Sequence, residues 1–335
     1  MIISRTPLRV SLVGGGSDLP AWYERHGGAV VSMAIQQFVT IIVKRLAPFH
    51  DHRFRVSYSK TELASSVAEI AHPLVREALS LLDIDEPLEI VSISDVPAGT
   101  GLGSSSAFTV GLLHALHALR GEQPSWRQLA DEACEIEIER LSEPIGKQDQ
   151  YIAAAGGLEH IVFRPDGGVD VQPVRCSATR LAALEARLVA VHTGGARRAG
   201  DILREIEPSN TGTTRALREL AALCEPMRAI LEADGGGEPS AGLEGVGELL
   251  DLAWSSKRTL AGSVSSPRID ELYRTARQAG ATGGKLLGAG GSGFLLLYVE
   301  PQVRAAVLQA LNRHLTLPVR VAHQGSRIVY SELPG

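Results

Sequence analysis

A glycine-serine stretch, PAGTGLGSSSA at residues 97–107, constrains the fold of this 335-residue chain more than any other feature. The alternating segment LEIVSISDV precedes it, and an apolar segment of helical character follows it to about residue 119. A strand, a glycine-rich turn and a helix in this order build an anion site, because glycine adopts positive φ freely and the first N–H groups of a helix lack intrahelical acceptors. The sequence predicts that nucleotide phosphates bind here, although a plain strand-to-helix turn also accounts for the glycines.

Two common phosphate-binding patterns do not match this stretch. A Walker A loop needs a lysine after its last glycine, and none follows Gly103. The dinucleotide fingerprint G-x-G-x-x-G fails at Ser104. Two other segments accompany the stretch, TPLRVSLVGGGSDLP at residues 6–20 and GGKLLGAGGSGFLLLY at residues 283–298. In order and spacing, the three segments together resemble the motifs of the GHMP kinases, the family of galactokinase, homoserine kinase, mevalonate kinase and phosphomevalonate kinase.

Composition excludes several other classes of protein. The chain is 44% hydrophobic and 21% charged, and it is long enough for two domains. A net charge of −5 and 4% aromatic residues give no indication of nucleic-acid or membrane binding. Three scattered cysteines argue against a disulfide framework or a zinc site, and no apolar run approaches the ~20 residues that span a bilayer. We expect a cytoplasmic monomer or homodimer whose partners are small molecules.

The resemblance implies an α+β fold of the GHMP kinase type. We expect an N-terminal α/β domain at residues 1–180, which carries the phosphate loop, and a ferredoxin-like C-terminal domain at residues 181–335. The active site is expected between the two domains. Periodicity and turn signals predict strands at residues 2–13, 28–45, 54–59 and 88–94. They predict helices at residues 67–82, 104–119, 126–141, 197–205, 211–232, 246–258, 267–278 and 302–313.

Glu137 is the first carboxylate of interest. It lies within an apolar stripe formed by Ala130, Cys134, Ile138 and Leu141 at helical spacing. A carboxylate on a buried face needs a partner, and we expect a cation. The magnesium ion of ATP, a salt bridge to Arg or Lys, and a position at the wet edge of the stripe all remain open. The resemblance favours magnesium, with Ser105 as the hydroxyl ligand of the same ion.

Asp149, in SEPIGKQDQYIAAAGG, is the second carboxylate. By itself it can cap a short helix at residues 150–155. The segment resembles the one that holds the catalytic aspartate in sugar kinases of this family, where the carboxylate takes the proton of the attacking hydroxyl. The resemblance makes Arg9 its basic partner, although Arg9 can also pair across a strand. Ser142 stands where the resemblance leads us to expect glycine.

The remaining site residues are expectations from the three motifs. The ATP phosphates are assigned to a loop of nine residues: Pro97, Gly99, Thr100, Gly101, Leu102, Gly103, Ser104, Ser105 and Ser106. The acceptor is assigned to Gly16, Ser17, Asp18, Thr193, Gly194, Arg197, Lys285 and Gly290. An acceptor that already carries a phosphate needs a cationic pocket, which Arg197 and Lys285 would help to form, although Arg197 can equally belong to a solvated arginine pair.

The reaction expected from the resemblance is phosphoryl transfer from ATP, with Mg²⁺, to a sugar. The segments GGGSDLPAWYERHGGAVVSMAI, EPIGKQDQYIAAAGG and HTGGARRAGDIL resemble the heptose 7-phosphate kinase group. They imply transfer to O1 of D-glycero-D-manno-heptose 7-phosphate, which yields the 1,7-bisphosphate for nucleotide-heptose synthesis. Two alternatives are an anomeric kinase for an unphosphorylated, fucose-like sugar and a non-catalytic protein that senses sugar or ATP.

Overall fold

The N-terminal half is built around one long, curved sheet. The computed structural model describes residues 1–195, 199–206, 210–233 and 238–332. The sheet runs in the order β12-β1-β2-β5-β3-β4, with β6 paired to β2 and β7 paired to β6. Its strands are β1 (Ile2–Val13), β2 (Gly28–Arg45), β3 (Phe54–Ser57), β4 (Thr61–Ala64), β5 (Leu88–Ser94), β6 (Leu158–Phe163), β7 (Val169–Pro173) and β12 (Arg327–Ser331).

Strand β2 organises this sheet because it is long enough to have different partners along its length. Its first half pairs with β6, its second half pairs with β5, and β1 runs antiparallel to it along most of its length. The predicted strands at residues 2–13, 28–45 and 88–94 are confirmed with these bounds. The strand expected at residues 54–59 ends earlier, at Ser57.

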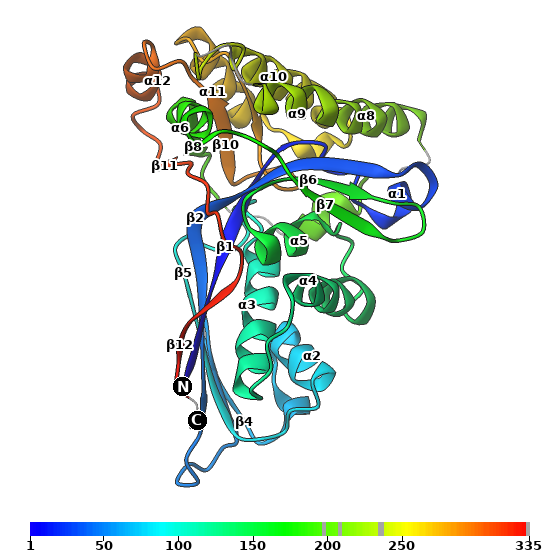
Figure 1. Cartoon of the computed structure of the whole chain (residues 1–335), viewed down its shortest axis with the longest axis vertical. Coiled ribbons are helices and arrows are strands. Elements are labelled where there is room, and N and C mark those ends of the chain that lie inside the picture. The colour runs from blue at the N-terminus through cyan, green and yellow to red at the C-terminus, as the bar shows by residue number, and fades with distance from the viewer. Residues whose placement is uncertain (196–198, 207–209, 234–237, 333–335) are drawn as a thin grey trace.

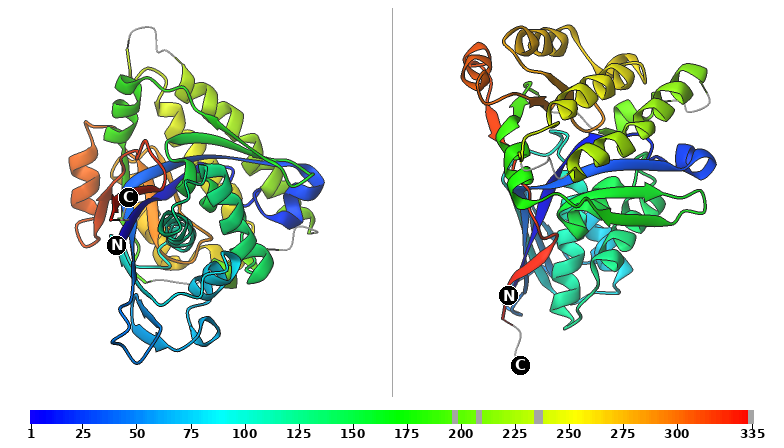
Figure 2. Two further views of the ribbon diagram at one scale, coloured as in Figure 1. Left: turned by 60° about the horizontal axis from the view of Figure 1, so that its bottom comes forward. Right: turned by 45° about the horizontal axis from the view of Figure 1, so that its top comes forward.

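Helices cover one face of the sheet (Figure 1). They are α1 (Pro20–His26), α2 (Pro73–Leu81), α3 (Ser104–Leu119), α4 (Trp126–Cys134) and α5 (Gln148–Ala155). Helix α3 packs on β1 and β2, and its apolar residues are nearly all buried. Seen end-on in the left view of Figure 2, α3 lies in the hollow of the curved sheet, enclosed by its neighbours.

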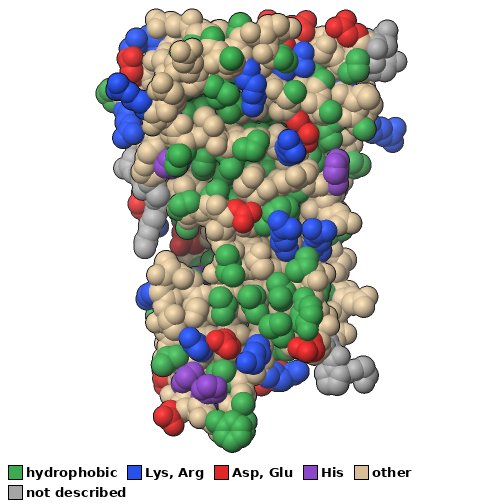
Figure 3. Space-filling view, turned by 90° about the vertical axis from the view of Figure 1, so that its left-hand side faces the viewer, with side chains coloured by type: hydrophobic (Ala, Val, Ile, Leu, Met, Phe, Trp, Pro, Cys, Tyr) green, Lys and Arg blue, Asp and Glu red, His purple; other side chains and the backbone are tan. Residues whose placement is uncertain are grey.

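The opposite face of the sheet carries exposed apolar side chains. Figure 3 shows them gathered in its lower half. Large exposed hydrophobic residues on the strands of this sheet are Leu63, Ile93, Val329 and Tyr330. No helix among the described residues is both long and apolar enough to cross a membrane.

The C-terminal half contains a second sheet with the order β11-β8-β10-β9 and all pairs antiparallel. Its strands are β8 (Leu188–His192), β9 (Gly283–Leu286), β10 (Phe294–Tyr298) and β11 (Thr316–Pro318). Its helices are α6 (Ala178–Arg187), α7 (Ala199–Leu203), α8 (Thr211–Ala222), α9 (Cys224–Glu232), α10 (Glu244–Arg258), α11 (Pro267–Gln278) and α12 (Arg304–Ala310). The strand order is ferredoxin-like, as expected, and the α+β fold is confirmed.

Three predicted helices are each divided into two elements in the structure. The segment at residues 67–82 splits into a 3₁₀ turn (Val67–Glu69) and α2, which starts at Pro73, because proline is favoured in the first helical turn. The segment at residues 211–232 is two helices, α8 and α9, with Leu223 between them. The segment at residues 126–141 is α4 followed by a π-helical turn, Glu135–Arg140. At its start, the Ser125 side chain accepts from the Gln128 N–H at 3.1 Å and caps the first turn.

The last strand returns to the N-terminal half. After β11 the chain makes a bridge from Val321 to Ile35 and then pairs β12 with β1. The Glu332 N–H donates to the Met1 carbonyl at 2.9 Å, so the two ends of the described chain lie together (Figure 1). The N-terminal sheet therefore contains the first and the last strand of the protein.

Candidate active site

A cavity of about 1150 Å³ brings the three sequence motifs together. Its wall includes Arg9 and Asp18 from the first motif, the loop at residues 97–106 from the second, and Lys285 and Gly290 from the third. Two further contributions come from the π-helical turn with Glu137 and from the start of α5. The cavity is large enough for a nucleotide and a second small molecule.

The glycines of the phosphate loop permit close contact with the other two motifs. Gly99, Gly101 and Gly103 all have positive φ, between 74° and 80°. A Cβ on Gly101 would lie 2.7 Å from the Leu287 carbonyl oxygen, too close for any side chain. A Cβ on Gly103 would lie 3.2 Å from Asp149 Oδ2. Here glycine is needed both for its backbone conformation and for the space it leaves.

Helix α3 presents its N-terminus to the cavity. It begins at Ser104, after Gly103 in the left-handed conformation, with no side-chain cap. The first N–H groups of such a helix, together with its dipole, favour an anion. The loop residues that line the cavity are Pro97, Ala98, Gly99, Gly101, Gly103, Ser104, Ser105 and Ser106. Thr100 and Leu102 are buried behind the loop, where the Thr100 hydroxyl donates to the Pro97 carbonyl at 2.9 Å.

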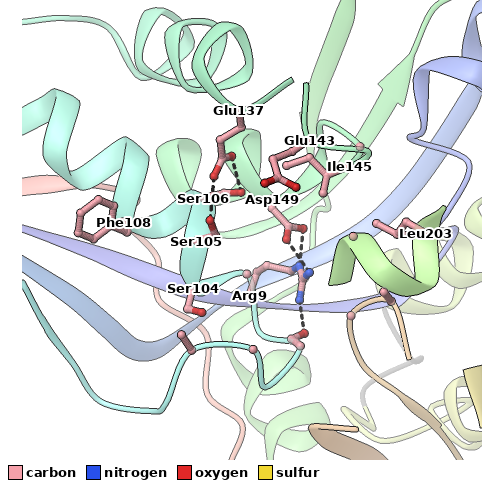
Figure 4. Close-up of a pocket in the computed structure, with 18 of the residues that line it drawn as sticks. Arg9, Ser104, Ser105, Ser106, Phe108, Glu137, Glu143, Ile145, Asp149 and Leu203 are labelled. Atoms are coloured by element: carbon pink, nitrogen blue, oxygen red, sulfur yellow. Dashed lines mark hydrogen bonds and ion pairs between the residues drawn. The ribbon is translucent and has the colours of Figure 1, made fainter. Parts of the chain in front are cut away.

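Arg9 and Asp149 form a bidentate ion pair beside the loop (Figure 4). Arg9 Nε donates to Asp149 Oδ1 at 2.6 Å, and Nη2 donates to Oδ2 at 2.7 Å. The third guanidinium contact runs from Nη1 to the Gly101 carbonyl at 2.5 Å. Asp149 lies in the first turn of α5, whose N-cap is Lys147, so it does not cap that helix. The pair fixes the Asp149 carboxylate at the end of the phosphate loop.

Glu137 is buried beneath the N-terminus of α3 and is held by neutral donors. Its side chain is 1% exposed. Ser105 and Thr109 donate to Oε1 at 3.1 Å each, whereas Ser106 and Gln150 donate to Oε2 at 2.7 and 2.5 Å. Burial raises the pKa of Glu137 to about 7, although these hydrogen bonds act in the opposite direction.

The surroundings of Glu137 narrow the alternatives for its partner. No Arg or Lys among the described residues forms an ion pair with Glu137, so the salt-bridge alternative is wrong for that part of the chain. The position at the wet edge of the stripe is also wrong, because the side chain is buried. A divalent metal fits the donor set, because Mg²⁺ is held by one or two carboxylates together with phosphate oxygens and water. Glu137 and the Ser105 hydroxyl both line the cavity at the helix N-terminus, where the phosphates are expected.

Asp18 is a buried carboxylate in the cavity wall, near the Arg9–Asp149 pair. It accepts from the Gly16 N–H at 2.9 Å and from the Gln148 N–H at 3.3 Å. Burial raises its pKa, and the negative charge of Asp149 adds to this effect. Gly16 lines the cavity beside it. Ser17 does not, since its hydroxyl donates to the Gly14 and Ala29 carbonyls and holds the turn together.

Of the C-terminal residues expected to bind the acceptor, some line the cavity and others do not. Lys285 and Gly290 line the cavity. Thr193 and Gly194 do not line it: the Thr193 hydroxyl donates to the Gly293 carbonyl at 2.9 Å, and Gly194 lies against the Arg268 guanidinium. Arg197 lies outside the described residues, so its expected contact has no structural account.

Several cavity residues were missed by sequence reasoning. Tyr58, His72 and Phe108 form an aromatic row, with His72 stacked on Phe108 at 4.9 Å between ring centroids and Tyr58 edge-on to His72 at 4.6 Å. They line the cavity, and a flat heterocyclic base fits beside such rings. Their sequence positions carry no shared pattern. Lys257 was also missed, because it occupies the last turn of an ordinary amphipathic helix.

The comparisons with known proteins agree with this geometry. The family model described as the GHMP kinases N-terminal domain matches residues 62–157, and the model of the GHMP kinases C-terminal domain matches residues 240–316. Together they cover about half of the chain. The sequence is 28% identical to D-glycero-alpha-D-manno-heptose 7-phosphate kinase of Campylobacter jejuni, over 93% of each protein.

Two other proteins extend the comparison. A bifunctional fucokinase/GDP-fucose pyrophosphorylase of Arabidopsis thaliana is 26% identical over 94% of this chain, which spans 31% of that longer protein. A crystal structure of a D-glycero-D-manno-heptose 1-phosphate kinase from Bacteroides thetaiotaomicron superimposes with a TM-score of 0.78 at 23% identity, covering 99% of this chain and all of that one. With both family models matched in order on this fold, the chain belongs to the GHMP kinases and is a phosphotransferase.

Proposed function

We propose that this protein transfers the γ-phosphate of ATP to the anomeric hydroxyl of D-glycero-D-manno-heptose 7-phosphate, which yields the 1,7-bisphosphate. The observation that carries the proposal is the position of the Arg9–Asp149 pair against Gly103 of the phosphate loop. A proton acceptor thereby lies next to the place where the terminal phosphate would be held. The similarity to a heptose 7-phosphate kinase over 93% of both proteins supports the choice of acceptor.

The donor end of the cavity suits ATP. The N–H groups at the start of α3 and the glycine loop would hold the phosphates, and the aromatic row of Tyr58, His72 and Phe108 would border the base. Glu137 and Ser105 would hold the magnesium ion that accompanies the phosphates and neutralises their charge.

The acceptor end suits a polyhydroxylated molecule. Asp18 would accept hydroxyl protons from the sugar while its two backbone N–H contacts fix its orientation. Asp149 would take the proton of the attacking hydroxyl, a role typically worth about 10²–10⁴-fold in rate. Arg9 keeps both Asp149 oxygens in place and brings positive charge to the region of the phosphate in transfer.

The deciding experiment is ADP release measured with a panel of acceptors. The panel contains D-glycero-D-manno-heptose 7-phosphate, the free heptose, mannose 6-phosphate, mannose, fucose and mevalonate. We expect the largest kcat/KM with the heptose phosphate, and ³¹P NMR should place the new phosphate on C1. Preferred turnover of mevalonate, or a product phosphorylated elsewhere on the sugar, would contradict the proposal.

The second candidate is an anomeric kinase for an unphosphorylated sugar such as fucose. The similarity of nearly the whole chain to a fucokinase-containing protein favours it. In the same panel this candidate requires that free fucose outperform every sugar phosphate. No ADP release with any acceptor would instead indicate a non-catalytic sensor.

A further inference from the structure

Two buried lysines line the cavity, and neither forms an ion pair with a carboxylate among the described residues. Lys257 is in the last turn of α10, and Lys285 is in β9. They are 7% and 3% exposed, yet both contribute to the cavity wall. Lysine is almost never so deeply buried without an anionic partner, so this pair needs an explanation.

Backbone carbonyls are the protein partners of both ammonium groups. Lys257 Nζ donates to the Leu286 carbonyl at 2.8 Å and to the Gly288 carbonyl. Lys285 Nζ donates to the Ser11 carbonyl at 3.0 Å and to the Leu12 carbonyl at 3.2 Å. An ammonium has three N–H donors, so each lysine retains one for a ligand. No carboxylate of the described segments lies within ion-pair distance of either lysine.

The electrostatics of the pair favour an incoming anion. Burial lowers the pKa of Lys257 well below its ordinary value, and the charge of Lys285 adds to this effect. Burial likewise lowers the pKa of Lys285 to about 7, with a further contribution from Arg9. The charge of Arg9 is balanced by an ion pair with Asp149, whereas neither lysine forms an ion pair with a described carboxylate, and only Asp18 acts on Lys285, from a longer distance. A doubly or singly charged phosphate would supply the missing negative charge.

The position of the pair is at the reacting end of the cavity. Lys257 holds the loop at Gly288, which touches the phosphate loop: a Cβ on Gly288 would lie 2.5 Å from the Gly101 Cα. Lys285 holds the first motif at Ser11, and the negative charge of Asp18 acts on it, raising the Lys285 pKa against the effect of burial. The two lysines therefore lie between the wall behind the phosphate loop and the wall that carries Asp18.

We propose that Lys257 and Lys285 form a binding site for one phosphate group inside this cavity. The phosphate is either the one that the acceptor already carries or the terminal phosphate of ATP. The proposal rests on the proposed function in that it places ATP and a small acceptor in the same cavity. It adds Lys257 as a ligand-binding residue and assigns both lysines to the same phosphate group.

The test uses Lys257→Gln and Lys285→Gln in the full-length protein. Glutamine keeps an N–H donor for the backbone carbonyls but removes the charge. Lys44→Gln, at an exposed position near the end of β2, is the matched control. Calorimetric titration measures binding of ATP, ADP, heptose 7-phosphate and free heptose, and steady-state kinetics give KM and kcat for each acceptor.

The two sources of phosphate predict different losses. If the lysines bind the acceptor's phosphate, both variants weaken heptose 7-phosphate binding about 10- to 100-fold, and leave free heptose, ATP and ADP unchanged. If they bind the terminal phosphate of ATP, affinity for ATP falls by a similar factor, about 10- to 100-fold, while affinity for ADP and for both acceptors stays the same. Equal losses for ATP and ADP together with equal losses for both acceptors would overturn the proposal, as would no loss at all in folded variants.

A measurement on the unmodified protein covers the case in which the variants do not fold. Acetic anhydride labels accessible, uncharged amines, and mass spectrometry reports the labelling of Lys257 and Lys285 against Lys44. We expect heptose 7-phosphate or ATP to protect both buried lysines and to leave Lys44 unaffected. Labelling that no phosphate compound changes would contradict the site. The acceptor panel tests the proposed function separately, because ATP and ADP binding to the lysines requires no turnover.

Discussion

Two of the carboxylates that line the cavity, Asp149 and Glu137, have opposite surroundings. Asp149 faces a guanidinium that takes both of its oxygens, and its side chain remains 22% exposed. Glu137 is 1% exposed and receives four hydrogen bonds from three hydroxyls and one amide, with no protein cation among the described residues. The contrast fits the roles proposed for them: Asp149 is held in one orientation, as a proton acceptor requires, whereas Glu137 has no protein cation among the described residues and can accept one that arrives with the ligand.

The strongest test of this contrast is Asp149→Asn. Loss of the proton acceptor should lower kcat about 10²–10⁴-fold, because general-base assistance is worth that much. The affinity for ATP should change little, since the phosphate loop is untouched. Kinetics of ADP release and calorimetric titration of ATP measure the two effects.

Asp18→Asn is the control from the same cavity. It is expected to raise KM for the acceptor with a much smaller change in kcat. If Asp149→Asn instead retains the unmodified kcat, Asp149 is not the base and its pair with Arg9 serves binding alone.

The second test is the pH dependence of stability. Glu137 has a pKa of about 7 in the folded protein, above its ordinary value of 4.5, because burial disfavours its charge. At Glu137 the folded state therefore holds its proton more tightly than the unfolded state between these values, so this group lowers stability by about 3 kcal/mol as pH rises through the window. Glu159, whose pKa burial also raises to about 7, acts in the same direction. Urea unfolding of the ligand-free protein between pH 5 and 8 measures this.

Glu137→Gln should remove this part of the pH dependence. Glu139→Gln, an exposed position on the same turn, should leave the profile as it is. A Glu137→Gln profile that follows the unmodified protein would show that Glu137 does not titrate in this range, and would weaken the contrast with Asp149.

The third test concerns magnesium. Glu137→Gln should raise the magnesium concentration needed for half-maximal rate about ten-fold, because a charged ligand is lost. Glu143→Gln is the matched comparison, since Glu143 also lines the cavity but is exposed. If Glu143→Gln raises the requirement and Glu137→Gln does not, the metal ligand is Glu143 and the role assigned to Glu137 is wrong.

The smallest effect is expected from a substitution in the segment between Glu137 and Asp149. Ser142 has a φ of 52°, a left-handed conformation in which glycine avoids the side-chain strain. Ser142→Gly should stabilise the protein by about 0.5 kcal/mol, since relief of strain is partly offset by the greater freedom of the unfolded chain. Asp83→Gly, at the same φ of 52° and far from the cavity, should give a similar gain in thermal unfolding.

The kinetics of these two variants sharpen the test further. If the segment between Glu137 and Asp149 only connects them, neither variant changes kcat. A fall in kcat with Ser142→Gly alone would mean that the strained turn positions one of the carboxylates.

Local signals in the sequence were sufficient for much of the fold. The glycine loop and the start of α3 at Ser104 depend on neighbouring residues alone, and the strands at residues 2–13 and 28–45 are long, regular and apolar. The helical stripe placed Glu137 on the buried face, where its side chain is found. These features are predictable because their causes lie within one segment of chain.

Other features depend on contacts between distant segments. Lys257 is one residue in an amphipathic helix, and its burial arises only when α10 packs against the third motif. Thr193 follows a strand in a glycine turn that sequence reasoning placed at the acceptor, but its hydroxyl is used to hold the Gly293 backbone. By contrast, the break between α8 and α9 at Leu223 has a local cause that periodicity overlooked, because Pro226 cannot donate to the Ala222 carbonyl and therefore interrupts a continuous helix.

The return of β12 to β1 makes the polypeptide a nearly closed ring. Cutting it at the junction of the two sheets would leave the first half without an edge strand that the second half supplies. A short linker between residues 1 and 332 would in turn bridge neighbouring atoms, and new ends could be opened at an exposed turn such as Asp166–Gly168. Circular permutants of this kind should fold, whereas a protein shortened before Arg327 should not retain an intact first sheet.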